Sequence, residues 1–366
     1  MTLQPHLIRR LWLAIKAPLD GPLMLFLGLI FALSLVVLYS ANNQGLDKID
    51  NKLIYTLLSL TIMWLLARSR PQSIMNFAPP IYGIGVVLLL AVHFKGVTVN
   101  GSTRWLELGI TRIQPSEIMK IALPMMLAWF FQKYELSMRW WHYLVAAVMI
   151  AIPCALVLKQ PDLGTTMLIA ASGFFVLFFV GLPWKVILGG MVAAGASMPV
   201  VWNMLHDYQR RRVMTMIDPM EDPLGAGYHI IQSMIAIGSG GPWGKGWLNG
   251  TQTHLDYIPE RTTDFIFAVY SEEFGLVGNV VLVFLYTLVL SRAMMITAGA
   301  QTLYGRAMAG AITLSFFVYA FVNMGMVAGI LPVVGVPLPF VSYGGTATVT
   351  LFVGMGMLMS IGNARR

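Results

Sequence analysis

Asp264 stands at the junction between the polar stretch 255–263 and a long apolar run. A carboxylate at the mouth of a membrane helix is costly unless it is paired, hydrated or used, so Asp264 is our candidate for a catalytic base. The structural alternative is a helix start, in which Thr262 or Thr263 caps the helix and Asp264 complements its dipole. A helix from Asp264 to Arg292 would be about 42 Å long against a hydrocarbon core of about 30 Å, so we expect Asp264 at the outer boundary.

The segment 114–120 also places charge at the start of an apolar run. Proline suits the first helical turn and glutamate the third position, and Glu117 and Lys120 are three residues apart, so they can form an ion pair on one helix face. An unpaired ammonium inside an apolar span is costly. The pair either fixes helix packing or lines the same polar cavity as Asp264, where it would hold a phosphate or orient the base.

A second aspartate, Asp162, opens another apolar run within the stretch 160–166. It is either an N-terminal cap or the partner of Asp264 in a two-carboxylate site. One or two carboxylates together with substrate phosphates are the usual way to hold Mg²⁺. The sequence identifies no certain cofactor, and a divalent cation, Mg²⁺ or Mn²⁺, is the candidate that Asp264 and Asp162 suggest.

Basic residues on the expected outer side would suit an anionic ligand. Arg104 and the run 210–212, which begins with Arg210, either grip a pyrophosphate by bidentate contacts or anchor the chain to lipid headgroups. Further candidates for substrate contact or support are Gln232, Lys245 and Arg261.

The composition excludes an ordinary soluble domain. Hydrophobic residues make up 57% of the chain and charged residues 11%, against about 25% charged in typical soluble domains. The net charge of +8 is scattered among loops, which favours anionic lipid headgroups and gives no indication of nucleic acid binding. The single cysteine, Cys154, excludes a disulfide framework within the chain, and the sequence contains no Walker loop or dinucleotide fingerprint.

The apolar runs predict an all-α integral membrane protein with about ten spans in one polytopic domain, 1–366. The expected spans are 21–40, 53–68, 76–94, 115–132, 141–158, 163–182, 184–204, 264–291, 306–329 and 340–361. The first run has no small-residue cleavage site behind it, so we expect it to remain as a helix. Prolines and glycines between 329 and 345 predict a kinked connection, either a wall of the substrate cavity or a stiff hairpin.

Lysines and arginines in the short loops predict that both termini are cytoplasmic. With this orientation twelve lie inside and six outside, although the long loop 205–263 adds five to the outer side. That loop, between spans 7 and 8, is too long to be structureless without a function. We expect short helices that lie on or re-enter the membrane, followed by glycine-rich backbone that lines a cavity.

Several of these motifs, in the same order, resemble the SEDS proteins (shape, elongation, division and sporulation), most closely the RodA branch. The motifs that carry the resemblance are 114–120, 160–165, 207–212, 225–246, 259–267 and 329–345, and the segment 245–252 favours RodA over FtsW. The resemblance implies a ten-span fold related to the GT-C glycosyltransferases and polymerisation of lipid II, a disaccharide-peptide on undecaprenyl pyrophosphate, in the bacterial inner membrane. It also implies a class B penicillin-binding protein and other membrane proteins of the elongation complex as partners.

The family's essential residues fall on positions already singled out. Its aspartate falls on Asp264, its Glu–Lys pair on Glu117 and Lys120, and its proline–aspartate on Pro161 and Asp162. The expected chemistry is one inverting displacement with Asp264 as general base. Two alternatives remain open: a transporter that flips lipid II, and a scaffold that only recruits the transpeptidase.

Overall fold

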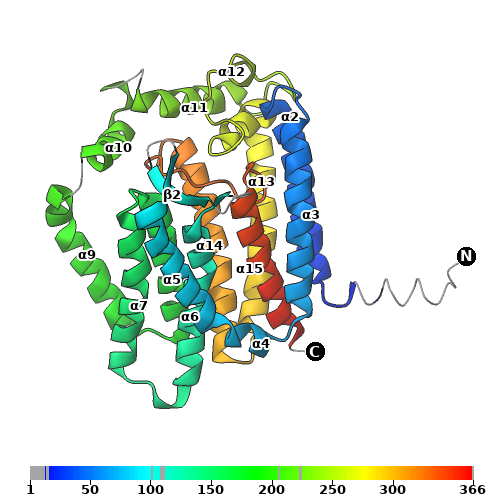
Figure 1. Cartoon of the computed structure of the whole chain (residues 1–366). Helices are drawn as coiled ribbons and strands as arrows, with labels where there is room; N and C mark the ends of the chain where they lie inside the picture. The colour runs from blue at the N-terminus through cyan, green and yellow to red at the C-terminus, as the bar shows by residue number, and fades with distance from the viewer. Residues whose placement is uncertain are drawn as a thin grey trace, which may run out of the picture.

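The computed structural model describes residues 13, 16–99, 102–107, 112–204, 207–221 and 225–364, and the fold is almost entirely helical (Figure 1). The long helices are α2 (Gly21–Ala41), α3 (Asp47–Arg68), α5 (Ala78–Lys95), α6 (Pro115–Lys133), α7 (Trp140–Leu158), α8 (Leu163–Val180), α9 (Trp184–Met204), α13 (Ile266–Ala298), α14 (Leu303–Val327) and α15 (Gly345–Asn363). Shorter helices are α4 (Pro71–Asn76), α10 (Asp207–Ile217), α11 (Ala226–Gly240) and α12 (Thr251–His254), with single 3₁₀ turns at Glu135–Ser137 and Pro219–Glu221.

Eight of the long helices in the described part of the chain are long and apolar enough to cross a membrane. The two others are α6, which carries Glu117 and Lys120 in its first two turns, and α9, whose apolar stretch is shorter, Trp184–Val200. The protein is therefore a multi-pass membrane protein. Each of the ten predicted spans coincides with a long helix, but length and composition support eight of them as spans.

Some helix boundaries differ from the predicted ones for local reasons. α3 begins six residues earlier than expected, at Asp47, because Asp47 and Asp50 lie in its first turn and complement the helix dipole. α15 begins five residues later than expected, at Gly345, because the proline-containing connection before it is not helical.

A small antiparallel sheet between α5 and α6 was not predicted. It has the order β1 (Val97–Val99), β2 (Ser102–Glu107) and β3 (Arg112–Ile113). β2 lies at the end of the bundle that also carries α11 and α12 (Figure 1). The sheet matters for the site because β2 carries Arg104.

The predicted span after Asp264 is confirmed as α13, but this helix is broken at Gly275. Gly275 has φ +65° and ψ −160°, and the loop 241–246 inserts its backbone at this break. Lys245 N–H donates to the Glu272 carbonyl at 3.0 Å, and Leu276 N–H donates to the Gly241 carbonyl at 2.9 Å. These bonds satisfy backbone groups that the break leaves without helical partners. The length of about 42 Å assumed an unbroken helix from Asp264 to Arg292, and α13 is not such a helix.

The core is formed where α14 packs against α8, α13 and α6, while α15 lies along α3. Buried residues of these helices, among them Met119, Ile169, Leu282, Phe316 and Met355, belong to one hydrophobic cluster. The helix α6 packs against β2, and α8 begins beside β2, where its N-cap Asp162 pairs with Arg104. Helix N-termini carry positive partial charge, so this end suits an anionic ligand.

Candidate active site

Asp264 lies in the turn before α13, at the edge of the helical core. The N-cap residue of α13 is Phe265, its first turn holds no acidic residue, and neither threonine makes a capping bond. The predicted cap by Thr262 or Thr263 is therefore wrong, although Asp264 still lies directly before the N-cap residue of the helix. The carboxylate is free for another role.

The backbone of Asp264 is fixed from behind. The buried side-chain amide of Asn323, on α14, donates to the Asp264 carbonyl at 2.8 Å and to the Val336 carbonyl at 2.7 Å. Gly335 has φ +70°, and a Cβ placed there would lie 3.3 Å from Asp264 Oδ2. The kinked connection between α14 and α15 therefore lies beside the carboxylate, and its role as a wall of the substrate cavity stays a prediction.

The surroundings of Asp264 shift the pKa of its carboxyl group towards neutral pH. The pKa of Asp264 is raised from its ordinary value of 3.8 to about 6: burial is the main cause, the Glu260 carboxylate also raises it, and the Arg104 guanidinium lowers it. A general base is most effective when its pKa lies near the working pH.

Arg104 connects Asp264 with Asp162. Its Nη1 lies 3.1 Å from Asp162 Oδ2, and its charge also acts on Asp264. Asp162 is buried and caps α8, accepting from Thr165 N–H at 3.0 Å and from the Thr165 hydroxyl at 2.9 Å. The predicted capping role of Asp162 is thus confirmed, and the same carboxylate positions Arg104 near Asp264.

Glu117 and Lys120 form the expected ion pair in the first turns of α6. Lys120 Nζ lies 2.6 Å from Glu117 Oε1, both side chains are buried, and Lys120 Nζ also lies 5.1 Å from the ring centroid of Tyr319 on α14. The second carboxylate oxygen of Glu117 has no hydrogen-bond partner among the described residues. The pair therefore connects α6 to α14 and keeps an acceptor available.

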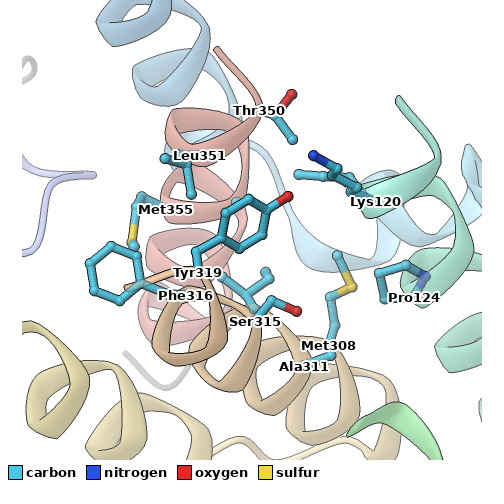
Figure 2. Close-up of a pocket in the computed structure, with 13 residues that line it drawn as sticks. Lys120, Pro124, Met308, Ala311, Ser315, Phe316, Tyr319, Thr350, Leu351 and Met355 are labelled. Carbon is cyan, nitrogen blue, oxygen red and sulfur yellow. The ribbon is translucent and has the colours of Figure 1, made fainter. Parts of the chain in front are cut away.

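Lys120 and Tyr319 also line a mainly apolar cavity between α6, α14 and α15 (Figure 2). Its volume is about 50 Å³, and Figure 2 shows the polar ends of Lys120, Tyr319 and Thr350 gathered at one side of it. Asp264 does not line this cavity. The prediction that the Glu–Lys pair and Asp264 share one cavity is therefore not met by this cavity.

Three of the remaining candidates hold other parts of the chain. Lys245 Nζ lies 2.7 Å from Oε1 of the fully buried Glu272. Arg261 donates to the carbonyls of Ala41 at 2.7 Å and Thr253 at 2.6 Å and pairs with Asp256.

The third is Arg210, which donates to the carbonyls of Trp202 at 3.0 Å and Asn203 at 2.8 Å, close to the end of α9. Gln232 is half-buried on α11. The contacts that Arg210, Lys245 and Arg261 make anchor segments within the protein and do not bring these residues to Asp264.

Glu272 and Glu273 anchor neighbouring segments of the chain. Glu272 accepts from the backbone N–H groups of Gln252 at 2.9 Å and Thr253 at 3.2 Å, and Glu273 accepts from the Ser40 hydroxyl of α2. The two carboxylates thus fasten helices α12 and α2 to the first half of α13.

Sequence reasoning missed the residues that support Asp264 from behind. Buried Lys52 donates to the carbonyl of Val341 at 2.6 Å, and the Ser342 hydroxyl donates to the carbonyl of Thr263 at 2.6 Å. Asn323 belongs to the same support. Lys52 and Asn323 are polar residues in or beside apolar runs, so the rule that identified Lys120 could have identified both.

Comparison with known proteins shows the family. Residues 19–366 match the FtsW, RodA and SpoVE family of cell cycle proteins, and the chain belongs to this family. The chain is 50% identical over 352 residues to peptidoglycan glycosyltransferase MrdB of Escherichia coli K12, covering 96% of this chain and 95% of that one. It is 35% identical to a probable peptidoglycan glycosyltransferase FtsW of Trichlorobacter lovleyi, covering 94% and 93%. The predicted family is confirmed.

Solved structures agree with this assignment. A chain from a peptidoglycan synthase complex that coordinates polymerization and crosslinking has a TM-score of 0.82 and 33% identity, covering 94% of this chain and 98% of that chain. RodA of Thermus thermophilus has a TM-score of 0.71 and 28% identity, covering 94% and 97%. The fold is therefore that of RodA.

Proposed function

We propose that the protein is a peptidoglycan glycosyltransferase that polymerises lipid II into glycan strands for cell elongation and rod shape. The similarity to MrdB of Escherichia coli supports the reaction class. The observation that carries the proposal is Asp264 itself. It is a carboxylate with a pKa of about 6 and without a capping role, it lies just before the N-terminus of α13, and the charge of Arg104 acts on it.

The reaction is a single inverting displacement. Asp264 accepts the proton of the acceptor's GlcNAc 4-hydroxyl as its oxygen attacks C1 of the donor's MurNAc. The new β-1,4 bond forms while the bond from C1 to the phosphate oxygen breaks, and undecaprenyl pyrophosphate leaves with the bonding electrons. The α-linked donor and the β-linked product require one inversion, so no covalent enzyme intermediate is needed.

Arg104 and the helix N-termini at this end of the bundle stabilise the negative charge on the leaving pyrophosphate. The buried Glu117–Lys120 pair supports the site from α6. The interactions of Arg104 and of the helix N-termini with the pyrophosphate strengthen as negative charge grows on the leaving group. Interactions that are stronger in the transition state accelerate the chemical step.

A divalent cation fits this site only in part. Within the described ranges, no group of three or more His, Cys, Asp or Glu residues gathers to hold a metal. Asp162 has only one acceptor position left for a metal, because Thr165 and Arg104 already donate three hydrogen bonds to its two oxygens. Mg²⁺ or Mn²⁺, if bound, would be held by Asp264 and the substrate's phosphates.

The proposed setting is the bacterial inner membrane, with one polytopic domain over 1–366, both termini in the cytoplasm, and Asp264 and the loop 205–263 on the outer side. The proposed partner is a class B penicillin-binding protein, which crosslinks the new strands within an elongation complex. Similarity to a chain from a complex that coordinates polymerization and crosslinking supports this pairing.

The proposal is tested with the purified full-length chain, with and without the partner, and labelled lipid II. Glycan strands separated by electrophoresis are expected from the complex. Lipid II that crosses the bilayer of sealed vesicles without any strand formation would favour a flippase instead. A stable complex that neither polymerises nor translocates lipid II would favour a scaffold.

A further inference from the structure

Three consecutive carbonyl groups at the candidate base are each held by a hydrogen bond from another part of the chain. The carbonyl of Thr262 accepts from Tyr343 N–H at 2.8 Å. The carbonyl of Thr263 accepts from the Ser342 hydroxyl at 2.6 Å, and the carbonyl of Asp264 accepts from α14. Two of these three donors belong to the turn that directly precedes α15. The position of Asp264 therefore depends on that turn.

The turn 338–343 has a buried and strained backbone. Val341 and Ser342 are both buried, and buried carbonyl groups require hydrogen-bond partners. Phe340 has φ +61°, which is unfavourable for a residue with a side chain and persists only where the surrounding structure enforces it. Within the turn, Leu338 and Ser342 bond to each other. The carbonyls of Val341 and Ser342 therefore need donors from outside the turn.

Lys52 on α3 supplies these donors. Its ammonium donates to the carbonyl of Val341 at 2.6 Å and to the carbonyl of Ser342 at 3.3 Å. The side chain is buried, and it forms no ion pair with any residue that the structure describes. A buried ammonium without a carboxylate partner is costly in a membrane span, so such a residue is a candidate for a functional role.

A continuous path of hydrogen bonds thus leads from α3 to the base. Lys52 holds the carbonyl of Ser342, the Ser342 hydroxyl holds the carbonyl of Thr263, and the next residue along the chain is Asp264. Lys52 lies among the buried residues of α3, the helix along which α15 packs. Loss of the ammonium would leave two buried carbonyls without their donor and would release the turn that holds the base.

We propose that Lys52 is a positioning residue for the glycosyl transfer: it fixes the turn 338–343, and through Ser342 this turn fixes the carboxylate of Asp264. The inference rests on the proposed function, in which Asp264 is the general base. A displacement of about 1 Å at a reacting group costs on the order of a hundredfold in rate. Lys52 acts through the base and does not bind lipid II, so its loss lowers kcat and leaves KM unchanged.

The test compares steady-state polymerisation kinetics and thermal unfolding of the full-length protein in complex with its transpeptidase partner. Lys52→Met removes the donor at similar side-chain length, Lys52→Gln keeps an amide donor, and Ser342→Ala breaks the next step of the path. The exposed Lys95→Met is the control for the chemical change. Met63→Ala is the control for stability, because Met63 is buried on the same helix and contacts α15 further along it.

We expect Lys52→Met and Ser342→Ala to lower kcat about tenfold or more with unchanged KM, and Lys52→Gln to recover part of the loss. The double variant should be no slower than the slower single variant, because both changes break one path. Met63→Ala should lose thermal stability and keep the wild-type kcat, and Lys95→Met should match the wild type in both.

Two results would overturn the proposal: wild-type kcat in both Lys52→Met and Ser342→Ala, or an equal fall of kcat in Met63→Ala. Should Lys52→Met not fold, kcat of Lys52→Gln and Ser342→Ala decides by the same criterion. A wild-type complex that makes no glycan strands would contradict the proposed function itself, so the two failures are distinguishable.

Discussion

Asn323 holds Asp264 by its backbone: the Asn323 amide donates to the Asp264 carbonyl at 2.8 Å and, on the other side, to the Val336 carbonyl at 2.7 Å. The donating amide belongs to α14. Its two hydrogen bonds join the turn before α13 to the connection between α14 and α15, which lies beside the carboxylate. The position of Asp264 is therefore fixed by a helix that is distant in sequence. It does not depend on a helix cap formed by neighbouring residues.

Removal of this support should misplace the base. We expect Asn323→Ala to lower kcat about tenfold or more, because two buried hydrogen bonds that fix Asp264 are lost, while KM changes little. Steady-state polymerisation kinetics would show this. Asn279→Ala is the matched control, since Asn279 pairs with Ser271 at 3.0 Å away from Asp264. Equal losses in the two variants would mean that Asn323 has no special positioning role.

The pH dependence of polymerisation should follow Asp264. The carboxylate must be ionised to accept a proton, so the rate should rise with pH through about 6. Glu260→Gln removes a charge that raises the pKa of Asp264 and should move the midpoint to lower pH, whereas Arg104→Gln should move it to higher pH. Initial rates between pH 5 and pH 8 give the midpoints. Identical midpoints in all three proteins would contradict the assignment of the base.

Asp264→Asn should be at least as stable as the wild type at neutral pH. The folded pKa, about 6, lies above the ordinary value of 3.8, so the folded state binds the proton more tightly and the wild type loses stability as pH rises from about 4 to 6. An amide has no such dependence, and the gain above pH 6 is on the order of 2 kcal/mol. Thermal unfolding at pH 4.5 and pH 7.5 tests this: a variant that is less stable at pH 7.5 would contradict it.

Lys245 should be a structural residue. Its removal leaves the fully buried Glu272 without its cation, so Lys245→Met should destabilise the protein by about 3 kcal/mol and expose the loop 241–255 to protease. Glu272→Gln added to this variant should recover much of the loss. Unfolding temperatures and limited proteolysis of the two single variants and the double variant give the coupling. A raised KM for lipid II with unchanged stability would instead place Lys245 on the substrate.

Gly275 should tolerate no side chain. Its φ is +65°, and a Cβ there would lie 2.3 Å from the backbone nitrogen of Gly244, so Gly275→Ala should disrupt the junction of α13 with the loop 241–246. We expect a loss of folded protein, measured by gel filtration in detergent. Gly189→Ala, where a Cβ meets nothing within 4 Å, is the control. Normal behaviour of both variants would show that the break is adaptable.

The sequence predicted the site's charged residues better than their arrangement. Asp264, the Glu117–Lys120 pair and the Asp162 cap are local features, set by residue type and by spacing along one helix. The approach of Arg104 depends on a small sheet whose strands are too short to give a clear alternating pattern. The break at Gly275 depends on backbone bonds from a loop about thirty residues earlier, which no local pattern shows.

The central claim is that Asp264 acts as the general base of the reaction. The most direct measurement uses the purified complex of Asp264→Asn with its transpeptidase partner, and it compares the yield of glycan strands that this complex makes from labelled lipid II. The exposed Asp47→Asn carries the same chemical change and serves as the control. The account predicts normal strands from the control and a loss of at least a hundredfold from Asp264→Asn, with the complex intact. Strands from Asp264→Asn at the wild-type yield would contradict it.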